Sequence, residues 1–404
     1  MSRNGGHQRS LRSIECGERI LNVSTEQAAQ DSRSPLKERE ATLLVREFLL
    51  SVAGHGLSHT TPRVPFSVPE SVFDEFLGGL TTERLVGAAA EAYTDRALVL
   101  TSSQFDSLNR LHKDWLQQAV GVERLLIRFA ELLRAEGIPF RSLKGVALAQ
   151  VVYRDPAWRV FADLDVLVAA DRLDEAVQLA LRQLGGHRAE PEIRPGFDSE
   201  FAKDVLVHVD QIELDLHRTL ISGPFGFTIG LDDVFAGSAP HRVGDVEVPA
   251  LDAVSMFMHA CYNAALGDYP PRLSGLRDLA LVAVHLQIDR DVVADVARRW
   301  RATAVVRQAA EITVRELGLH ASHPLSGLIN LEVRRGQRLL LRSYETPARS
   351  YTRPLASAIV MRGVRSRWKF VRALVTPSRE YLASRGWSLR SHAARARDRL
   401  LGRG

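Results

Sequence analysis

Two aspartates, Asp163 and Asp165, stand two residues apart in a short apolar segment that has the composition of a β-strand. Side chains two positions apart on a strand project to the same face, so the two carboxylates lie together while Leu164 and Val166 take the opposite face. Two like charges this close need a cation. The pair therefore predicts a cation-binding site on one face of a sheet.

A second acidic segment repeats this alternation, with Glu213, Asp215 and His217 on one face of a strand expected over residues 212–216. It supplies a third carboxylate. Three carboxylates on adjacent strands suit two divalent ions ~3.5 to 4 Å apart that clamp an attacking oxygen and a leaving phosphate. Oxygen ligands favour Mg²⁺, with Mn²⁺ as the alternative.

A turn at Lys144 and Gly145 precedes the paired aspartates and opens a helix expected over residues 146–153. Backbone N–H groups at a helix start can donate to phosphate oxygens, and Lys144 and Arg159 would add positive charge. Ser142, just before the turn, is a further candidate. This segment is therefore expected to bind a phosphate-bearing nucleotide.

Two polar residues, His259 and Asp278, interrupt apolar helical patterns later in the chain. A buried polar side chain often needs only a hydrogen-bond partner. A structural role and a substrate-facing role are therefore both open for these two residues.

An Asp-x-Asp pair on a strand is by itself most simply a solvated face, but the order of the neighbouring motifs favours a site. Four motifs follow one another along the chain: Leu143-Lys144-Gly145, Tyr153-Arg-Asp155-Pro156-Ala-Trp-Arg159, Asp163-Leu-Asp165-Val-Leu-Val168 and Asp215-Leu-His217. This order resembles the DNA polymerase beta-type nucleotidyltransferase superfamily, and within it the bacterial branch labelled uncharacterised nucleotidyltransferase. The resemblance covers roughly residues 40 to 320.

The resemblance implies roles for these residues. Asp163 and Asp165 would bind both metal ions, and Asp215 would complete the metal site and help to activate the acceptor hydroxyl. Glu213 competes with Asp215 as the third carboxylate, and His217 would support the site or contact the acceptor. Because Lys144-Gly145 stands where many members have Gly-Gly or Gly-Ser, Lys144 is either a ligand of the triphosphate or a turn residue.

The implied activity is Mg-dependent transfer of a nucleoside monophosphate from an NTP, most simply ATP, with release of pyrophosphate. The acceptor would be a hydroxyl, amine or phosphate of a small molecule, peptide or protein. Two alternatives stay open: a non-catalytic binding or regulatory protein on the same fold, and a toxin-type enzyme that adds nucleotides to tRNA.

The expected fold class is α+β, with a small mixed β-sheet flanked by N-terminal and C-terminal helical domains. The predicted divisions are a mobile leader (1–35), an N-terminal helical domain (36–137), the nucleotidyltransferase core (138–249), a C-terminal helical domain (250–330) and a basic helical tail (331–404). No Gly-x-x-x-x-Gly-Lys-Ser/Thr and no Gly-x-Gly-x-x-Gly occurs, which argues against P-loop and dinucleotide folds.

Composition narrows the class further. The apolar fraction of 45% and the charged fraction of 25% are those of a globular protein. No apolar run is long enough to cross a bilayer and the start lacks a secretory signal, so a cytoplasmic protein is expected. The two cysteines, Cys16 and Cys261, exclude a disulfide framework.

The net charge of +5 is unevenly distributed, because residues 331–404 carry 18 Arg and Lys against 4 Asp and Glu. Such a tail could contact RNA, an anionic lipid surface or an acidic partner. A solvated arginine-rich helix is the simpler interpretation.

Overall fold

The computed structural model describes residues 35–57, 60, 64–344 and 352–400. Cys16 and nearly all of the expected leader lie outside these residues. The chain divides into two compact units, residues 1–48 and 49–404. All residues assigned above to a site belong to the second unit.

The segment expected to be helical, residues 36–137, contains α2 (Pro35–Gly54), α3 (Glu70–Thr82) and α5 (Ser102–Ala135). The long helix α5 begins with a capping box, in which Thr101 and Gln104 exchange side-chain and backbone hydrogen bonds. The sequence analysis missed α4 (Val86–Thr94) and the two-residue strands β1 (Phe66–Ser67) and β2 (Leu98–Val99). The alanine-rich α4 lacks the alternation of apolar and polar residues that reveals a helix.

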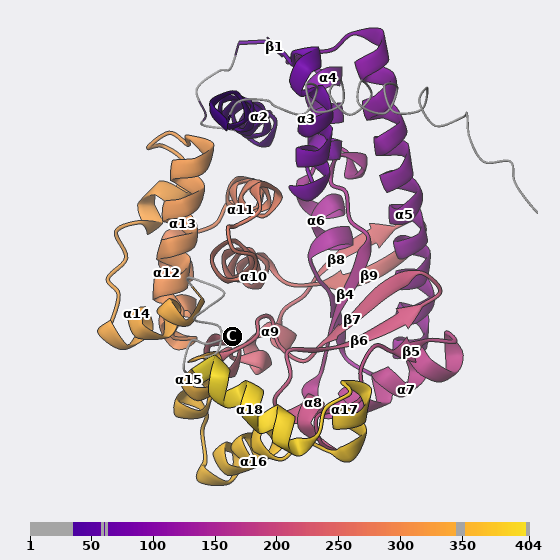
Figure 1. Ribbon diagram of the computed structural model, residues 1–404, viewed down its shortest axis with the longest axis vertical. Coiled ribbons are helices and arrows are strands. Elements are labelled where there is room, and N and C mark those ends of the chain that lie inside the picture. Colours follow the sequence, from indigo (N-terminus) through magenta and orange to yellow (C-terminus); the bar gives the residue numbers. More distant parts are fainter. Residues whose placement is uncertain (1–34, 58–59, 61–63, 345–351, 401–404) are drawn as a thin grey trace, which may run out of the picture. The chain divides into compact units, whose positions relative to one another are not determined.

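A mixed sheet of seven strands lies at the centre of the second unit, in the order β5-β6-β7-β4-β3-β9-β8 (Figure 1). The strands are β3 (Phe140–Ser142), β4 (Asp163–Val168), β5 (His187–Arg188), β6 (Asp204–Val209), β7 (Ile212–His217), β8 (Ala239–Val243) and β9 (Val246–Ala250). The two strands predicted to carry the acidic segments are β4 and β7, whereas β5 and the hairpin β8–β9 were not predicted. The expected α+β fold class is confirmed.

One face of this sheet is apolar and is covered by α5 and α7 (Leu173–Gln183) (Figure 1). Leu164 and Val166 of β4 and Leu214 of β7 are buried there in one cluster with Phe129 of α5 and Val177 of α7. Because side chains alternate along a strand, burying these residues leaves the intervening polar positions on the other face.

Helices follow the sheet, as expected: α10 (Ala253–Leu266), α11 (Leu273–His285), α12 (Arg290–Arg299) and α13 (Thr303–Leu317). An almost fully buried ion pair, Arg277 to Glu91 at 2.6 Å, joins α11 to α4. The N-terminal and C-terminal helices are therefore bonded directly to each other as well as flanking the sheet.

The segment expected as a basic tail forms α14 (Arg335–Leu341), α15 (Arg353–Val360), α16 (Val364–Val375), α17 (Arg379–Ser384) and α18 (Leu389–Leu400). Phe370 of α16 stacks on Phe197 of α8 (Phe197–Glu200), with ring centroids 6.0 Å apart. Among the described residues, no helix is both long and apolar enough to cross a membrane.

Candidate active site

Parallel pairing of β4 with β7 brings the two acidic segments together. Asp165 lies opposite Asp215, and Asp163 lies opposite Glu213. Partners in register point to the same face of a sheet, so the acidic side chains of both strands share the face away from α5 and α7. Adjacent strands were expected from the sequence, whereas the register that sets Asp165 opposite Asp215 comes from the parallel pairing.

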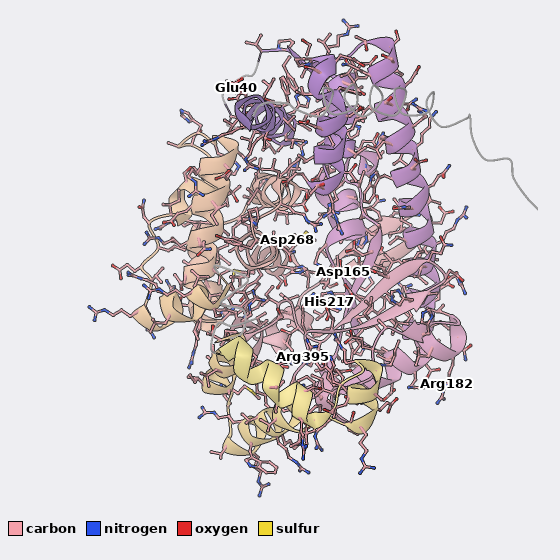
Figure 2. All side chains as sticks on the ribbon, viewed as in Figure 1. Glu40, Asp165, Arg182, His217, Asp268 and Arg395 are labelled. Atoms are coloured by element: carbon pink, nitrogen blue, oxygen red, sulfur yellow. The ribbon has the colours of Figure 1, made fainter. Side chains whose placement is uncertain are left out.

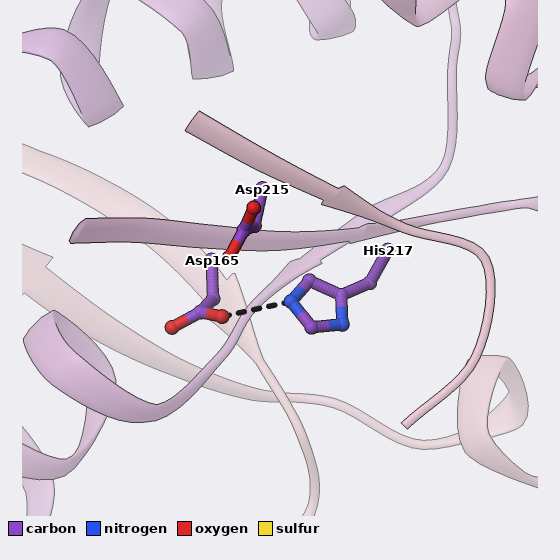
Figure 3. A group of neighbouring side chains, drawn as sticks. All are labelled: Asp165, Asp215 and His217. Carbon is purple, nitrogen blue, oxygen red and sulfur yellow. Dashed lines mark hydrogen bonds and ion pairs between the residues drawn. The ribbon is translucent and has the colours of Figure 1, made fainter. Parts of the chain in front are cut away.

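Asp165 is the centre of the site. Its Oδ1 accepts a hydrogen bond from Lys144 Nζ at 2.7 Å and lies 2.7 Å from Nε2 of His217. The Asp165 and His217 side chains are 1% and 0% exposed, and Figure 2 shows them side by side in the interior. Figure 3 shows the His217 ring directed at the Asp165 carboxylate, with Asp215 next to it.

The electrostatics differ sharply between the two aspartates. Burial by itself would raise the pKa of Asp165, but the Lys144 ammonium and the His217 ring outweigh it and hold the pKa well below its usual range. Burial, together with the negative charge of Asp204, raises the pKa of Asp215 to about 6. Asp165 is thus a fixed anion, whereas for Asp215 the effects of burial and of Asp204 outweigh those of His217 and Lys203.

Lys144 is the first residue of α6 (Lys144–Val152), with a φ of 25°. Burial acts to lower its pKa, but the Asp165 carboxylate more than compensates and raises it. Its ammonium therefore stays charged against Asp165. The predicted turn residue is also a charge partner of the site.

Asp163 and Glu213 lie differently from Asp165 and Asp215. The Asp163 carboxylate pairs with Arg84 Nη1 at 3.4 Å, and Glu213 is exposed. The group of side chains close enough to share one ion, with ligand atoms within 4.8 Å of one another, consists of Asp165, Asp215 and His217. Of Glu213 and Asp215, the two candidates for the third carboxylate, Asp215 lies in this group. The metal-binding roles of these residues stay a prediction.

Arg159 and Asp278, both predicted site residues, form an ion pair at 2.9 Å. Tyr153 donates its hydroxyl to the same carboxylate at 2.7 Å. Tyr153 and Arg159 of the second motif thus both contact Asp278 of α11. The Asp278 carboxylate therefore has two partners within the protein. Arg159 also lines the cleft described below.

Three further predicted residues surround the Lys144 turn. Ser142 Oγ and His259 Nε2 are buried with no hydrogen-bond partner among the described residues, and both side chains line a cavity of about 20 Å³. A space of this size and polarity suits one water molecule. Burial lowers the pKa of His259 well below its usual range, so its ring is neutral. Gly145 packs so tightly that a Cβ there would lie 3.2 Å from Phe161.

The sequence analysis missed Asp204 and Lys203 at the start of β6. Asp204 lies opposite His217 in the antiparallel β6–β7 pair, and its carboxylate pairs with Lys203 Nζ at 2.6 Å. Val205, Val207 and Val209 alternate with Leu206 and His208, as expected for a strand. Extending this alternation by one residue would have placed Asp204 on the acidic face.

A cleft of about 320 Å³ opens beside these carboxylates. Its lining includes three aspartates, Asp163, Asp268 and Asp278, and six cationic side chains, namely Arg84, Lys144, Arg159, Lys203, Arg272 and Arg353. They come from segments before, within and after the sheet. Such a concentration of cations suits an anionic ligand, and no single stretch of sequence reveals it.

The donor atoms fit a hard divalent cation. Both contacts of the Asp165 carboxylate use Oδ1, so Oδ2 has no partner among the described residues. The Asp215 carboxylate likewise makes no hydrogen bond or ion pair within the described part of the chain, and burial and the charge of Asp204 raise its pKa. Two adjacent carboxylates with free oxygens are a donor set that Mg²⁺ or Mn²⁺ accepts. Asp165, Asp215 and His217 could therefore hold a metal ion.

Comparison with known proteins agrees with this geometry. The sequence model of a family described as "Uncharacterised nucleotidyltransferase" matches residues 69–318, which contain both strands of the site and α10 to α13. No curated protein matches the chain.

Proposed function

The chain belongs to the uncharacterised nucleotidyltransferase family, and from this premise we propose that it is a Mg-dependent enzyme. It would move a nucleoside monophosphate from an NTP to a hydroxyl, amine or phosphate of an acceptor, with pyrophosphate leaving. The bond broken is the one between the α-phosphate and its bridging oxygen to the β-phosphate, and the new bond joins the α-phosphate to the acceptor atom. The acceptor proton passes to a base or to solvent.

The observation that carries this proposal is the in-register pair Asp165 and Asp215, which lies beside a cleft lined by cations. A bound divalent ion would neutralise charge on the transferred phosphate. Positioning and charge neutralisation supply most of the catalysis in phosphoryl transfer. In this proposal, Asp165 and Asp215 would supply the ion site and the cleft cations would position the phosphates.

Each residue has a proposed task. Asp165 and Asp215 would hold the ion, with Lys144 and His217 keeping the Asp165 carboxylate ionised and oriented. Asp215 is also the proposed acceptor of the hydroxyl proton. Asp163 is the proposed ligand for a second ion, and it would have to exchange Arg84 for that ion.

The experiment is calorimetric titration of the full chain with ATP, GTP, CTP and UTP in Mg²⁺ and in chelator. Wild type should bind at least one NTP in a metal-dependent way, and Asp165→Asn should lose the metal-dependent part. Asp210→Asn, an exposed acid-to-amide change in the β6–β7 turn, is the matched control and should bind like wild type. Equal binding with and without metal in wild type would refute the proposal.

The acceptor is proposed to be a small molecule or a peptide. RNA contact through the basic C-terminal helices is a further proposal, and it would show as binding that weakens steeply with salt. Incubation with labelled NTP and total tRNA, compared with the Asp165→Asn variant, separates a tRNA-modifying enzyme from the others.

A further inference from the structure

The six cations of the cleft are not equivalent. Five of them, Arg84, Lys144, Arg159, Lys203 and Arg272, are each paired with a carboxylate at 2.6 to 3.4 Å. Within the described ranges, Arg353 alone among the six has no carboxylate partner. Among the described residues, its charge is therefore the one in the cleft without a paired carboxylate.

Arg353 is nevertheless held in place. Its Nε donates to the Ser343 carbonyl oxygen at 3.1 Å, and its guanidinium lies 4.5 Å from the centroid of the Tyr344 ring. Neither Nη group of Arg353 donates a hydrogen bond to a described residue. They remain available as a planar pair of donors.

Tyr344 fixes this arrangement to the rest of the cleft. Its side chain is buried, and its hydroxyl donates to the carbonyl oxygen of Ser222, which also lines the cleft. At the neighbouring Gly223, with a φ of 82°, a Cβ would lie 2.4 Å from the Tyr344 hydroxyl oxygen. Only glycine allows this close approach, so the loop and the Tyr344–Arg353 stack are shaped for each other.

We propose that Arg353 binds the polyphosphate of the nucleotide, so that the segment after the family-matched residues supplies part of the binding site. A guanidinium fork binds phosphate oxygens in a bidentate way that lysine cannot reproduce. Arg353 lies beyond the matched residues 69–318, and so its role is not carried by the family match. That the polyphosphate belongs to an NTP rests on the proposed function. That Arg353 binds an anion does not depend on it.

The test uses the full-length chain and two probes: inorganic tripolyphosphate in chelator, and ATP with Mg²⁺. Arg353→Gln should weaken tripolyphosphate binding at least about tenfold, the effect of losing charge-assisted hydrogen bonds, and Arg353→Lys should recover only part of it. Arg362→Gln removes an exposed arginine outside the cleft and should bind like wild type. Circular dichroism and thermal unfolding of each variant show whether the fold is retained.

The outcomes separate the two proposals. If Arg353→Gln binds both probes as wild type does, or if wild type does not bind tripolyphosphate, the role of Arg353 is overturned. If tripolyphosphate binding depends on Arg353 while no NTP binds with Mg²⁺, the anion site stands and the nucleotidyltransferase proposal fails. If the glutamine variant unfolds, Arg353→Lys decides: wild-type affinity in that variant contradicts a bidentate contact.

Discussion

Replacing the Asp215 carboxylate by an amide is expected to change the stability of the protein in opposite directions without and with Mg²⁺. Asp215→Asn should stabilise the protein in chelator at pH 8 and should lose the stabilisation that Mg²⁺ gives to wild type. The Asp215 side chain makes no hydrogen bond or ion pair to a described residue, so the amide breaks no such contact. The substitution removes chiefly a negative charge next to Asp165 and Asp204.

The magnitude follows from the pKa. Folding raises the pKa of Asp215 from 3.8 to about 6, so the folded protein binds this proton more tightly than the unfolded chain. The contribution of Asp215 to wild-type stability therefore falls as the pH rises between these two values and is level above them. The full difference corresponds to about 3 kcal/mol, which solvent exposure of part of the carboxylate reduces to about 2 kcal/mol. For a chain of this length that is about 3 °C in melting temperature.

The assay is thermal unfolding of both proteins in chelator at pH 4, 6 and 8, and again with Mg²⁺ at pH 8. In chelator at pH 8 the variant should have a higher melting temperature than wild type, and this difference should shrink toward pH 4. With Mg²⁺ at a hundredfold excess over its Kd, wild type should gain about 2.7 kcal/mol and the order should reverse. A variant less stable than wild type in chelator at pH 8 would show that Asp215 already has a favourable partner, and the reasoning would be wrong.

Three further variants test the contacts around the site. Asp165→Asn should abolish metal-dependent NTP binding and lower the free energy of unfolding by about 2 to 3 kcal/mol in urea, because Lys144 loses its carboxylate. Arg277→Met should cost about 3 to 5 kcal/mol in the same assay, because the buried Glu91 keeps only the longer contact with the exposed Arg154 at 3.9 Å. Adding Glu91→Gln should restore much of this loss, and a double variant as unstable as the single one argues against the pair. Gly87→Ala should cost about 2 kcal/mol or more, since the new Cβ would lie 2.3 Å from a backbone oxygen of η1 (Pro156–Trp158); unchanged urea stability would mean that α4 can shift.

Much of the fold was readable from local patterns. Alternation identified the strands that carry Asp165 and Asp215, and helical periodicity identified α5 and α10 to α13. Elements that are too short or too uniform to show a period, such as α4 and β5, were not found. Periodicity needs several residues of contrast between a buried and an exposed face, and these elements do not provide it.

The sequence by itself identified the candidate site residues: the aspartates of both strands, the Lys144 turn and His217. Their types and spacing fix the face that each side chain takes on its own strand. Tertiary structure decided which of them meet. Parallel pairing of β4 with β7 set Asp165 opposite Asp215, and an arginine from the N-terminal helices turned out to hold Asp163. Contacts between segments far apart in the chain, including the one that brings Arg353 into the cleft, depend on packing that no local pattern encodes.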